Sequence, residues 1–156
     1  MPDVNQNRAN AGGFDPRLFL RDEELDYGIA LILAGERVLM SAAGGIAAQQ
    51  DIPTLAARVL VAARFQPGQT VSQLRDQLDA TVPTIARILG ELDTRGFIER
   101  RKARSDARAR EIYLTHEGKR ATDAAALAMR DKLREAYRQA GATSVAGTRA
   151  VLEALK

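Results

Sequence analysis

The residues of this chain with the most obvious chemistry stand close together. The stretch RRKARSDARAR, residues 100–110, holds six positive charges and one aspartate in eleven positions. Guanidinium groups bind phosphates and base edges through paired hydrogen bonds, so this composition suits contact with a polyanion. A solvated basic tail and a targeting signal have the same composition. The elements on either side of the stretch must decide between the three.

Other reactive groups are scarce. The 156 residues include no cysteine and a single histidine, His116. Disulfides, thiolate metal sites and thiol redox sensing are therefore excluded, and one histidine leaves no partner for a histidine metal cluster. We expect His116 to lie on the surface. With no nucleophile–base pair and no metal set in view, we expect no enzyme, no cofactor and no metal.

Length and charge favour a soluble chain with one basic patch. The net charge is +3, and residues 98–110 hold six basic residues against two acidic ones. Residues 1–13 are polar and predict a disordered tail rather than a signal peptide. The sequence contains no unbroken run of eighteen apolar residues, so it predicts no membrane span. We therefore expect a cytoplasmic protein with no membrane contact.

Helical periodicity organises the first half of the chain. Apolar residues recur at helical spacing over residues 14–50, although Gly44-Gly45 leaves open whether this helix breaks. Asp51, followed by Pro53, predicts the start of a second helix that runs to Arg64.

A short helix, a turn and a longer helix follow. Ser72 is expected to cap a helix over 73–79, and Thr81 a helix over 82–94. The longer helix has a polar face that includes Thr84 and Arg87, opposite an apolar face of Ile85, Ile88, Leu89 and Leu92. Gly96 provides a left-handed residue at its end.

The periodicity then changes to that of strands. FIER, residues 97–100, and REIYLT, residues 110–115, predict two strands, with Ile112 and Leu114 on one face. The basic stretch is thus the tip of a hairpin and not a tail. Helices over 116–140 and 144–155 complete the chain, the first of them capped by Thr115.

This order of elements is that of a winged helix-turn-helix. The predicted fold is mainly α with a small β-hairpin wing, and combines a winged helix-turn-helix lobe with a helical dimerisation lobe. A helix fits the major groove of DNA, and a basic hairpin beside it reaches the neighbouring minor groove.

Three segments resemble the MarR-type winged-helix regulators. TVSQL (70–74) is similar to the start of their scaffold helix, and TIARILGELDTRGFIERR (84–101) to their recognition helix and first wing strand. SDARAREIYLTHEGK (105–119) resembles their wing, with the family's Asp-x-Arg and Leu-Thr-x-x-Gly patterns at Asp106, Arg108, Leu114, Thr115 and Gly118. Pro83 and Ala86 depart from the serine and threonine frequent there, which leaves the base preference open.

The resemblance implies a homodimer whose terminal helices interlock and whose two lobes bind a pseudo-palindrome. The corresponding division is a tail (1–13), an N-terminal dimerisation helix (14–50), a DNA-binding lobe (51–115) and C-terminal dimerisation helices (116–156). Regulators of this family often respond to small aromatic or amphipathic ligands. Tyr27 and Phe65 are candidates for the lining of a ligand cavity, but we expect them to pack in the core and therefore assign no ligand-binding residue.

Each DNA-contacting residue has an expected role. Thr81, Pro83, Thr84 and Arg87 face the major groove. Asp106 and Arg108 belong to the wing in the minor groove, where the carboxylate orients the guanidinium. Ser72, Arg101, Lys102 and Arg104 meet phosphates.

The predicted function is a sequence-specific regulator of transcription that binds double-stranded DNA as a homodimeric repressor, with a possible small-molecule effector. A constitutive DNA-binding protein without an effector is one alternative. A winged helix used for protein contact is another, and it leaves the arginine cluster unexplained.

Overall fold

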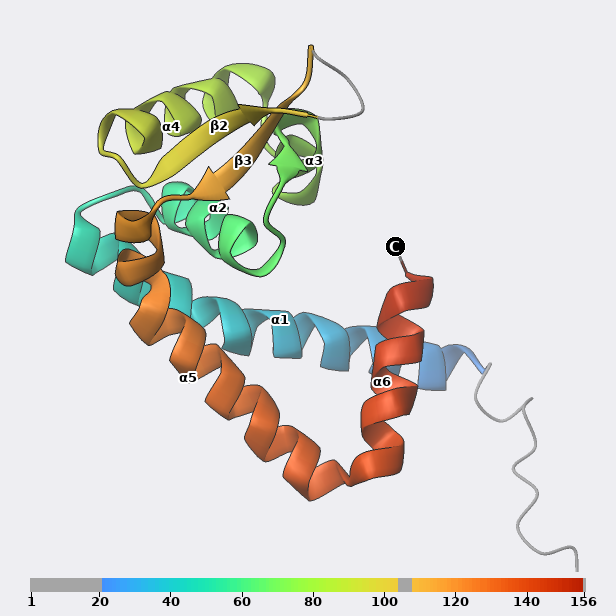
Figure 1. Cartoon of the computed structure of the whole chain (residues 1–156). Helices are drawn as coiled ribbons and strands as arrows, with labels where there is room; N and C mark the ends of the chain where they lie inside the picture. Colours follow the sequence, from blue (N-terminus) through green and yellow to red (C-terminus); the bar gives the residue numbers. More distant parts are fainter. Residues whose placement is uncertain (1–20, 104–107, 156) are drawn as a thin grey trace, which may run out of the picture. The chain divides into compact units, whose positions relative to one another are not determined.

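The computed structural model describes residues 21–103 and 108–155 and is mainly helical (Figure 1). The described residues divide into two units, with the boundary after Arg37, within α1. The elements, in chain order, are α1 (Asp22–Gln50), α2 (Thr54–Phe65), β1 (Gln69–Thr70), α3 (Val71–Gln77), α4 (Val82–Thr94), β2 (Ile98–Lys102), β3 (Arg110–Leu114), α5 (His116–Ala140) and α6 (Ala142–Ala154). The predicted fold class is confirmed.

α1 is one continuous helix of 29 residues, and Gly44-Gly45 does not break it. Most of its side chains are exposed, including the large apolar residues Leu25, Tyr27, Ile29, Leu31, Ile32, Leu33 and Val38. By length and composition alone it could cross a membrane, with a mean hydropathy of 1.6 over an 18-residue window that is 11% buried. The sequence expectation considered unbroken apolar runs and did not anticipate this.

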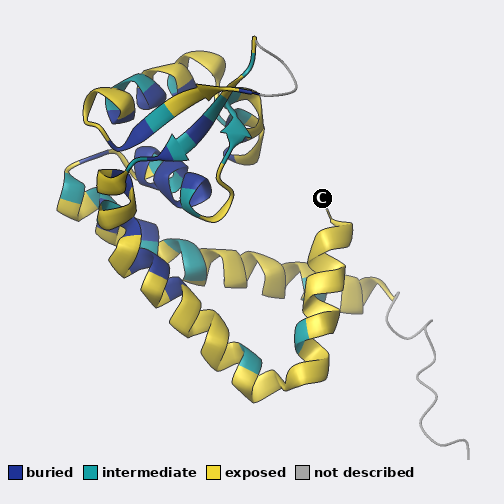
Figure 2. Ribbon diagram, in the orientation of Figure 1, coloured by how far each residue is buried: buried dark blue, intermediate teal, exposed yellow. Residues whose placement is uncertain are grey.

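The core lies mainly in the lobe that follows α1 and also includes Ala43 and Ile46 near the end of α1. Buried apolar side chains of α2, α4 and the sheet face one another, and Figure 2 shows this concentration of buried residues. Ile85, Ile88, Leu89 and Leu92 of α4 are all buried, as their spacing predicts. Burial of such a face is worth roughly 25 cal/mol per Å² of apolar surface, and it fixes which side of α4 points outward.

The sheet is antiparallel with strand order β1-β3-β2 in the described part of the chain. Ile98 pairs with Leu114 at one end of β2 and Lys102 with Arg110 at the other, so the basic stretch does connect two paired strands. Residues 104–107 of that connection lie outside the described residues. β1 was not predicted, because a two-residue strand has no readable periodicity.

Two predicted helix caps are wrong. Asp51 has a positive φ of 48°, and α2 begins after Pro53 with no side-chain cap. The cap of α3 is Thr70, which forms a reciprocal capping box with Gln73, and Ser72 lies inside the helix. A capping box needs Gln or Glu three residues after the cap, and that spacing already distinguished Thr70 from Ser72.

α5 and α6 change character along the chain. The first half of α5 is partly buried, through Thr122, Ala125, Ala126 and Met129. Most side chains of its second half are exposed. No residue of α6 is buried over its described length. Thr115 caps α5 by accepting from the Gly118 amide, and Gly141 ends it with φ +82°, both as predicted.

Candidate DNA interface

The outward side of α4 is the first part of the site. Because the opposite side is buried, Pro83, Ala86 and Arg87 are all exposed, and Thr84 is half-buried. The Arg87 side chain is 65% exposed and lies 3.7 Å from the Glu91 carboxylate one turn later. A surface pair of this kind is weak, so the guanidinium stays available to another partner.

The first turn of α4 is held by two threonines. The Thr81 hydroxyl accepts from the Thr84 amide, and the two threonine hydroxyls lie 2.8 Å apart and bond to each other. Gly96, with φ +72°, follows the other end of the helix. Both ends of the helix are therefore defined by local sequence, as expected for an element that must present a fixed surface.

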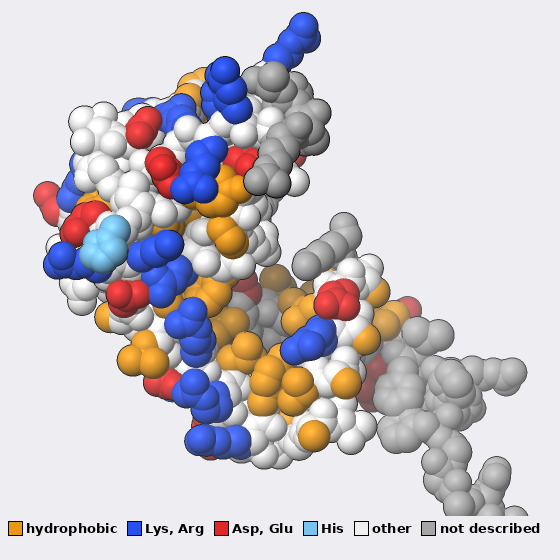
Figure 3. All heavy atoms as spheres, in the orientation of Figure 1, with side chains coloured by type: hydrophobic (Ala, Val, Ile, Leu, Met, Phe, Trp, Pro, Cys, Tyr) orange, Lys and Arg blue, Asp and Glu red, His pale blue; other side chains and the backbone are white. Residues whose placement is uncertain are grey.

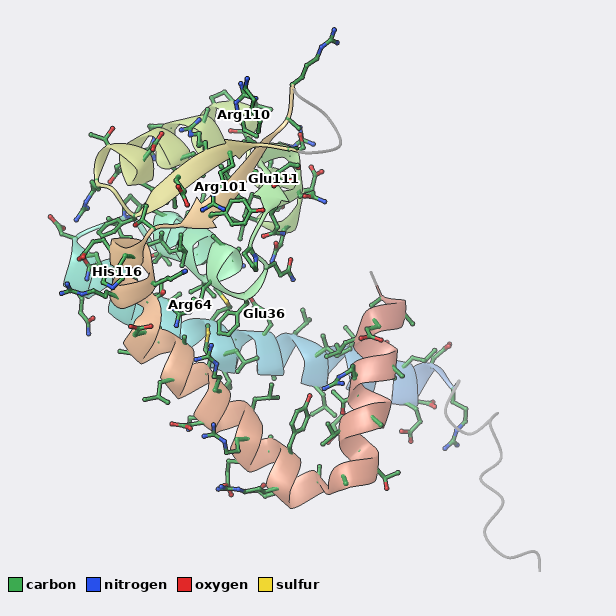
Figure 4. The ribbon with its side chains drawn as sticks, viewed as in Figure 1. Glu36, Arg64, Arg101, Arg110, Glu111 and His116 are labelled. Atoms are coloured by element: carbon green, nitrogen blue, oxygen red, sulfur yellow. The ribbon has the colours of Figure 1, made fainter. Side chains whose placement is uncertain are left out.

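The wing root carries the second part of the site. Arg101 pairs with Glu99, and its guanidinium lies 4.5 Å from the centre of the Tyr113 ring. The Tyr113 hydroxyl donates to Glu111, which is the cross-strand partner of Arg101 (Figure 4). Arg101 is thus oriented by neighbours on its own sheet.

The remaining predicted contacts are placed unevenly. Ser72 is exposed on α3, Lys102 is exposed at the end of β2, and Arg108 is exposed where the chain returns to β3. Arg104 and Asp106 lie outside the described residues, so the expected Asp106–Arg108 pair is not tested. His116 is exposed at the start of α5, as predicted.

Two arginines that sequence reasoning missed connect the lobe to its neighbouring helices. From α2, Arg64 donates to the Lys119 carbonyl and to Asp123 on α5. From the end of α4, Arg95 donates to the carbonyls of Gln50 and Asp51, where α1 ends. Arg64 is half-buried near the end of α2 and Arg95 directly follows α4, and no local sequence pattern distinguishes either arginine.

The start of α5 is fixed to the start of the wing. The Thr115 hydroxyl donates to the Gly96 carbonyl, and the Thr115 amide donates to the Phe97 carbonyl. Gly118 approaches that same carbonyl so closely that an added Cβ would lie 2.0 Å from its oxygen. These contacts explain why threonine and glycine are needed three residues apart.

A groove of about 540 Å³ lies between α5 and α6. Its lining includes the apolar Leu133 and Val145, the aromatic Tyr137 and the three arginines Arg130, Arg134 and Arg138. Figure 3 shows Lys and Arg side chains along α5 beside a hydrophobic surface.

Tyr27 and Phe65 are both exposed in the single chain, so their predicted place in the core is wrong. Within the described residues, no cluster of three or more acidic or histidine side chains could hold a metal.

A capped, outward-facing helix preceded by a short helix and followed by a basic hairpin defines a winged helix-turn-helix DNA-binding protein. The sequence model of the MarR family matches residues 50–109. The HTH-type transcriptional regulator PetP of Rhodobacter capsulatus is 35% identical over 147 residues, which cover 94% of this chain and 89% of PetP. The chain belongs to the MarR family of DNA-binding transcriptional regulators.

Solved structures agree on the fold. NadR in complex with 4-hydroxyphenylacetate has a TM-score of 0.65 at 22% identity, with 81% of this chain and 89% of NadR covered. The MepR–DNA complex of S. aureus has a TM-score of 0.51 at 21% identity, with 83% and 99% covered.

Proposed function

We propose that the protein is a cytoplasmic, homodimeric repressor that binds a pseudo-palindromic operator. The observation that carries this proposal is the outward face of α4, which presents the exposed Arg87 while its opposite face is fully buried. A repressor of this kind occludes the promoter when both lobes sit in successive major grooves, about 10 base pairs apart.

The dimer is supported by apolar surface that the single chain leaves exposed. α1 exposes a series of large hydrophobic residues, and α6 exposes Val151 and Leu152. Large apolar side chains left exposed in such number along a helix are typical of a protein–protein interface. We therefore assign residues 14–50 and 116–156 to dimerisation and 51–115 to DNA binding. If a second copy of the chain covers the apolar residues of α1, the high hydropathy of this helix is explained by dimerisation and requires no membrane.

On DNA, Thr81, Pro83, Thr84 and Arg87 face the major groove in this proposal. Arg108 lies in the minor groove with Asp106 as its orienting partner, and Ser72, Arg101, Lys102 and Arg104 meet phosphates. The exposure of Arg87, Lys102 and Arg108 supports their roles. Thr81 is engaged in capping, so its contribution is to hold the first turn and offer its methyl group.

We further propose that a small aromatic or amphipathic acid relieves repression. The support is the structural neighbour NadR, whose solved complex contains 4-hydroxyphenylacetate. An effector must bind the free and the DNA-bound conformations with different affinity to shift the equilibrium. Constitutive binding without an effector is the alternative.

Selection of bound duplexes from a random pool tests the central proposal. A two-fold symmetric consensus is expected, and a mass measurement of the complex should give two chains per duplex. No enrichment of any sequence contradicts DNA-binding specificity. Titration of the selected complex with 4-hydroxyphenylacetate then tests relief, and a promoter fusion carrying the consensus distinguishes repression from activation.

A further inference from the structure

The exposed face of α4 contains an apolar residue without an evident structural role. Among the described residues of 51–115, the large hydrophobic side chains left exposed are Phe65, at 45%, and Val82, at 60%. The Arg130 guanidinium lies 5.6 Å from the centre of the Phe65 ring. Val82 stands instead at the first position of α4, on the surface proposed to enter the major groove.

The polar side chains on the same part of α4 are partly engaged with each other, and one hydroxyl hydrogen of the threonine pair remains for a base. The Thr81 and Thr84 hydroxyls bond to each other at 2.8 Å, and Thr81 also accepts from the Thr84 amide. Pro83 and Ala86 are exposed and have no hydrogen-bonding side chain. Arg87 is the residue of this surface that carries the paired donors suited to a guanine edge.

An α4 surface of this composition favours readout through methyl groups. In the major groove the 5-methyl group of thymine is the apolar feature of the base edges, and aliphatic side chains pack against it. Val82 and Ala86 are four residues apart, so they lie on the same side of the helix, about 6 Å apart along its axis. That length corresponds to roughly two base-pair steps of about 3.4 Å.

We propose, on the basis of the proposed DNA-binding function, that Val82 and Ala86 determine the base preference by packing against thymine 5-methyl groups, while Arg87 binds a guanine beside them. Each half-site then contains one or two thymines within about two base pairs of that guanine. Ala86, one of the two residues without the hydroxyl frequent at its position, thereby contributes to specificity together with Val82.

Deoxyuridine substitution tests this inference, since it removes the 5-methyl group and leaves base pairing intact. Binding of the full-length protein is measured on the selected operator and on versions with each thymine replaced in turn. Loss of a buried methyl group, at roughly 0.8 kcal/mol, corresponds to about fourfold weaker binding per half-site and about 15-fold for both. Replacements outside the recognition positions should leave the affinity unchanged.

Protein variants locate the contact. In Val82→Ser, which removes both methyl groups, the thymine that Val82 contacts should lose most of its sensitivity to deoxyuridine, whereas Val82→Thr, which keeps one methyl group, should retain part of it. Arg87→Ala should keep that sensitivity and lose the preference for guanine. Two outcomes overturn the inference and leave the proposed function intact. In the first, a specific operator binds equally well with uracil in place of every thymine. In the second, the operator is sensitive to loss of the methyl group, but Val82 and Ala86 variants do not alter that sensitivity. Absence of any selected sequence overturns both.

Discussion

Arg64 and Asp123 form an ion pair of 2.7 Å that joins the end of α2 to the second turn of α5. The Arg64 side chain is 18% exposed, and its guanidinium also reaches the Lys119 carbonyl at 3.0 Å and the Thr122 hydroxyl at 3.4 Å. One side chain therefore connects a core helix of the winged lobe to three groups on the helix that leaves it. Such a forked contact restricts rotation between the two helices more than a single bond would.

Arg64→Ala should lower the free energy of unfolding by about 1–2 kcal/mol, because the α5 acceptors lose a charged donor. Asp123 is 61% exposed, so Asp123→Asn should cost less. The loss of unfolding free energy in Arg64→Lys should lie between those of Arg64→Ala and Asp123→Asn, since an ammonium group cannot reach all three acceptors at once. Urea unfolding at equal protein concentrations measures the three variants, and equal stability of Arg64→Ala and the unmodified protein would show the contacts to be incidental.

The elements that the sequence predicted well are those with local signals. Thr81 and Thr115 precede apolar helical runs, Gly96 follows one, and the alternation around Ile112 identifies β3. Each signal depends on a few neighbouring residues and the buried face beside them. The contacts of Arg64 and Arg95 join residues 44 to 59 positions apart, and no spacing within one helix predicts them.

The candidate site was predicted in outline for the same reason. Burial of Ile85, Ile88 and Leu92 determines that Arg87 points outward, and this could be read from spacing. The contacts of Arg101 with Glu99 and Tyr113 could not be predicted in this way, because they depend on strand register. The exposure of Val82 also escaped prediction, since valine at the first position of a helix is usually assigned to packing.

Gly118→Ala should be strongly destabilising. Its Cβ would lie 2.0 Å from the Phe97 carbonyl oxygen, and a backbone atom held by Thr115 cannot move aside cheaply. We expect a loss of about 3 kcal/mol of unfolding free energy.

Gly90→Ala is the matched control for this change. A Cβ there meets nothing within 4 Å, and the helical φ suits alanine, so stability should rise by about 0.5–1 kcal/mol. Thermal unfolding of both variants provides the comparison. A Gly118→Ala protein as stable as the Gly90→Ala protein would contradict the close approach of α5 to the wing.

Leu152→Glu should weaken the proposed dimer. Leu152 is exposed on α6 in the single chain, and a carboxylate at an apolar interface loses hydration without gaining a partner. Sedimentation equilibrium should show at least about a tenfold higher dissociation constant, equivalent to roughly 1.4 kcal/mol. Glu153→Gln, one position along the same helix, is the control and should leave association unchanged. Unaltered association of Leu152→Glu would remove this face of α6 from the dimer.

Salt dependence separates a phosphate-binding residue from a base-binding one. Lys102→Ala should weaken binding to all sequences about equally and reduce the slope of log affinity against log salt by about 0.9 for each phosphate that the lysine neutralises. Arg87→Ala should cost about 1–3 kcal/mol on the selected operator and relax the preference at one position per half-site. Titrations at several salt concentrations measure both effects. A slope that Lys102→Ala leaves intact would take this lysine off the phosphate backbone.

Arg108 is expected to act through the minor groove, where shape separates A·T from G·C and negative potential concentrates in narrow tracts. The hairpin that carries it is fixed at its base by the pairing of Lys102 with Arg110. Arg108→Ala should therefore lose affinity chiefly for operators with A·T-rich flanks, and Asp106→Ala should reproduce part of that loss if the carboxylate orients the guanidinium. Binding of both variants to operators that differ in their flanks measures the effect, with Lys102→Ala as the flank-independent comparison. If Arg108→Ala binds both flanks as the unmodified protein does, the basic hairpin acts through its net charge and not through an oriented arginine.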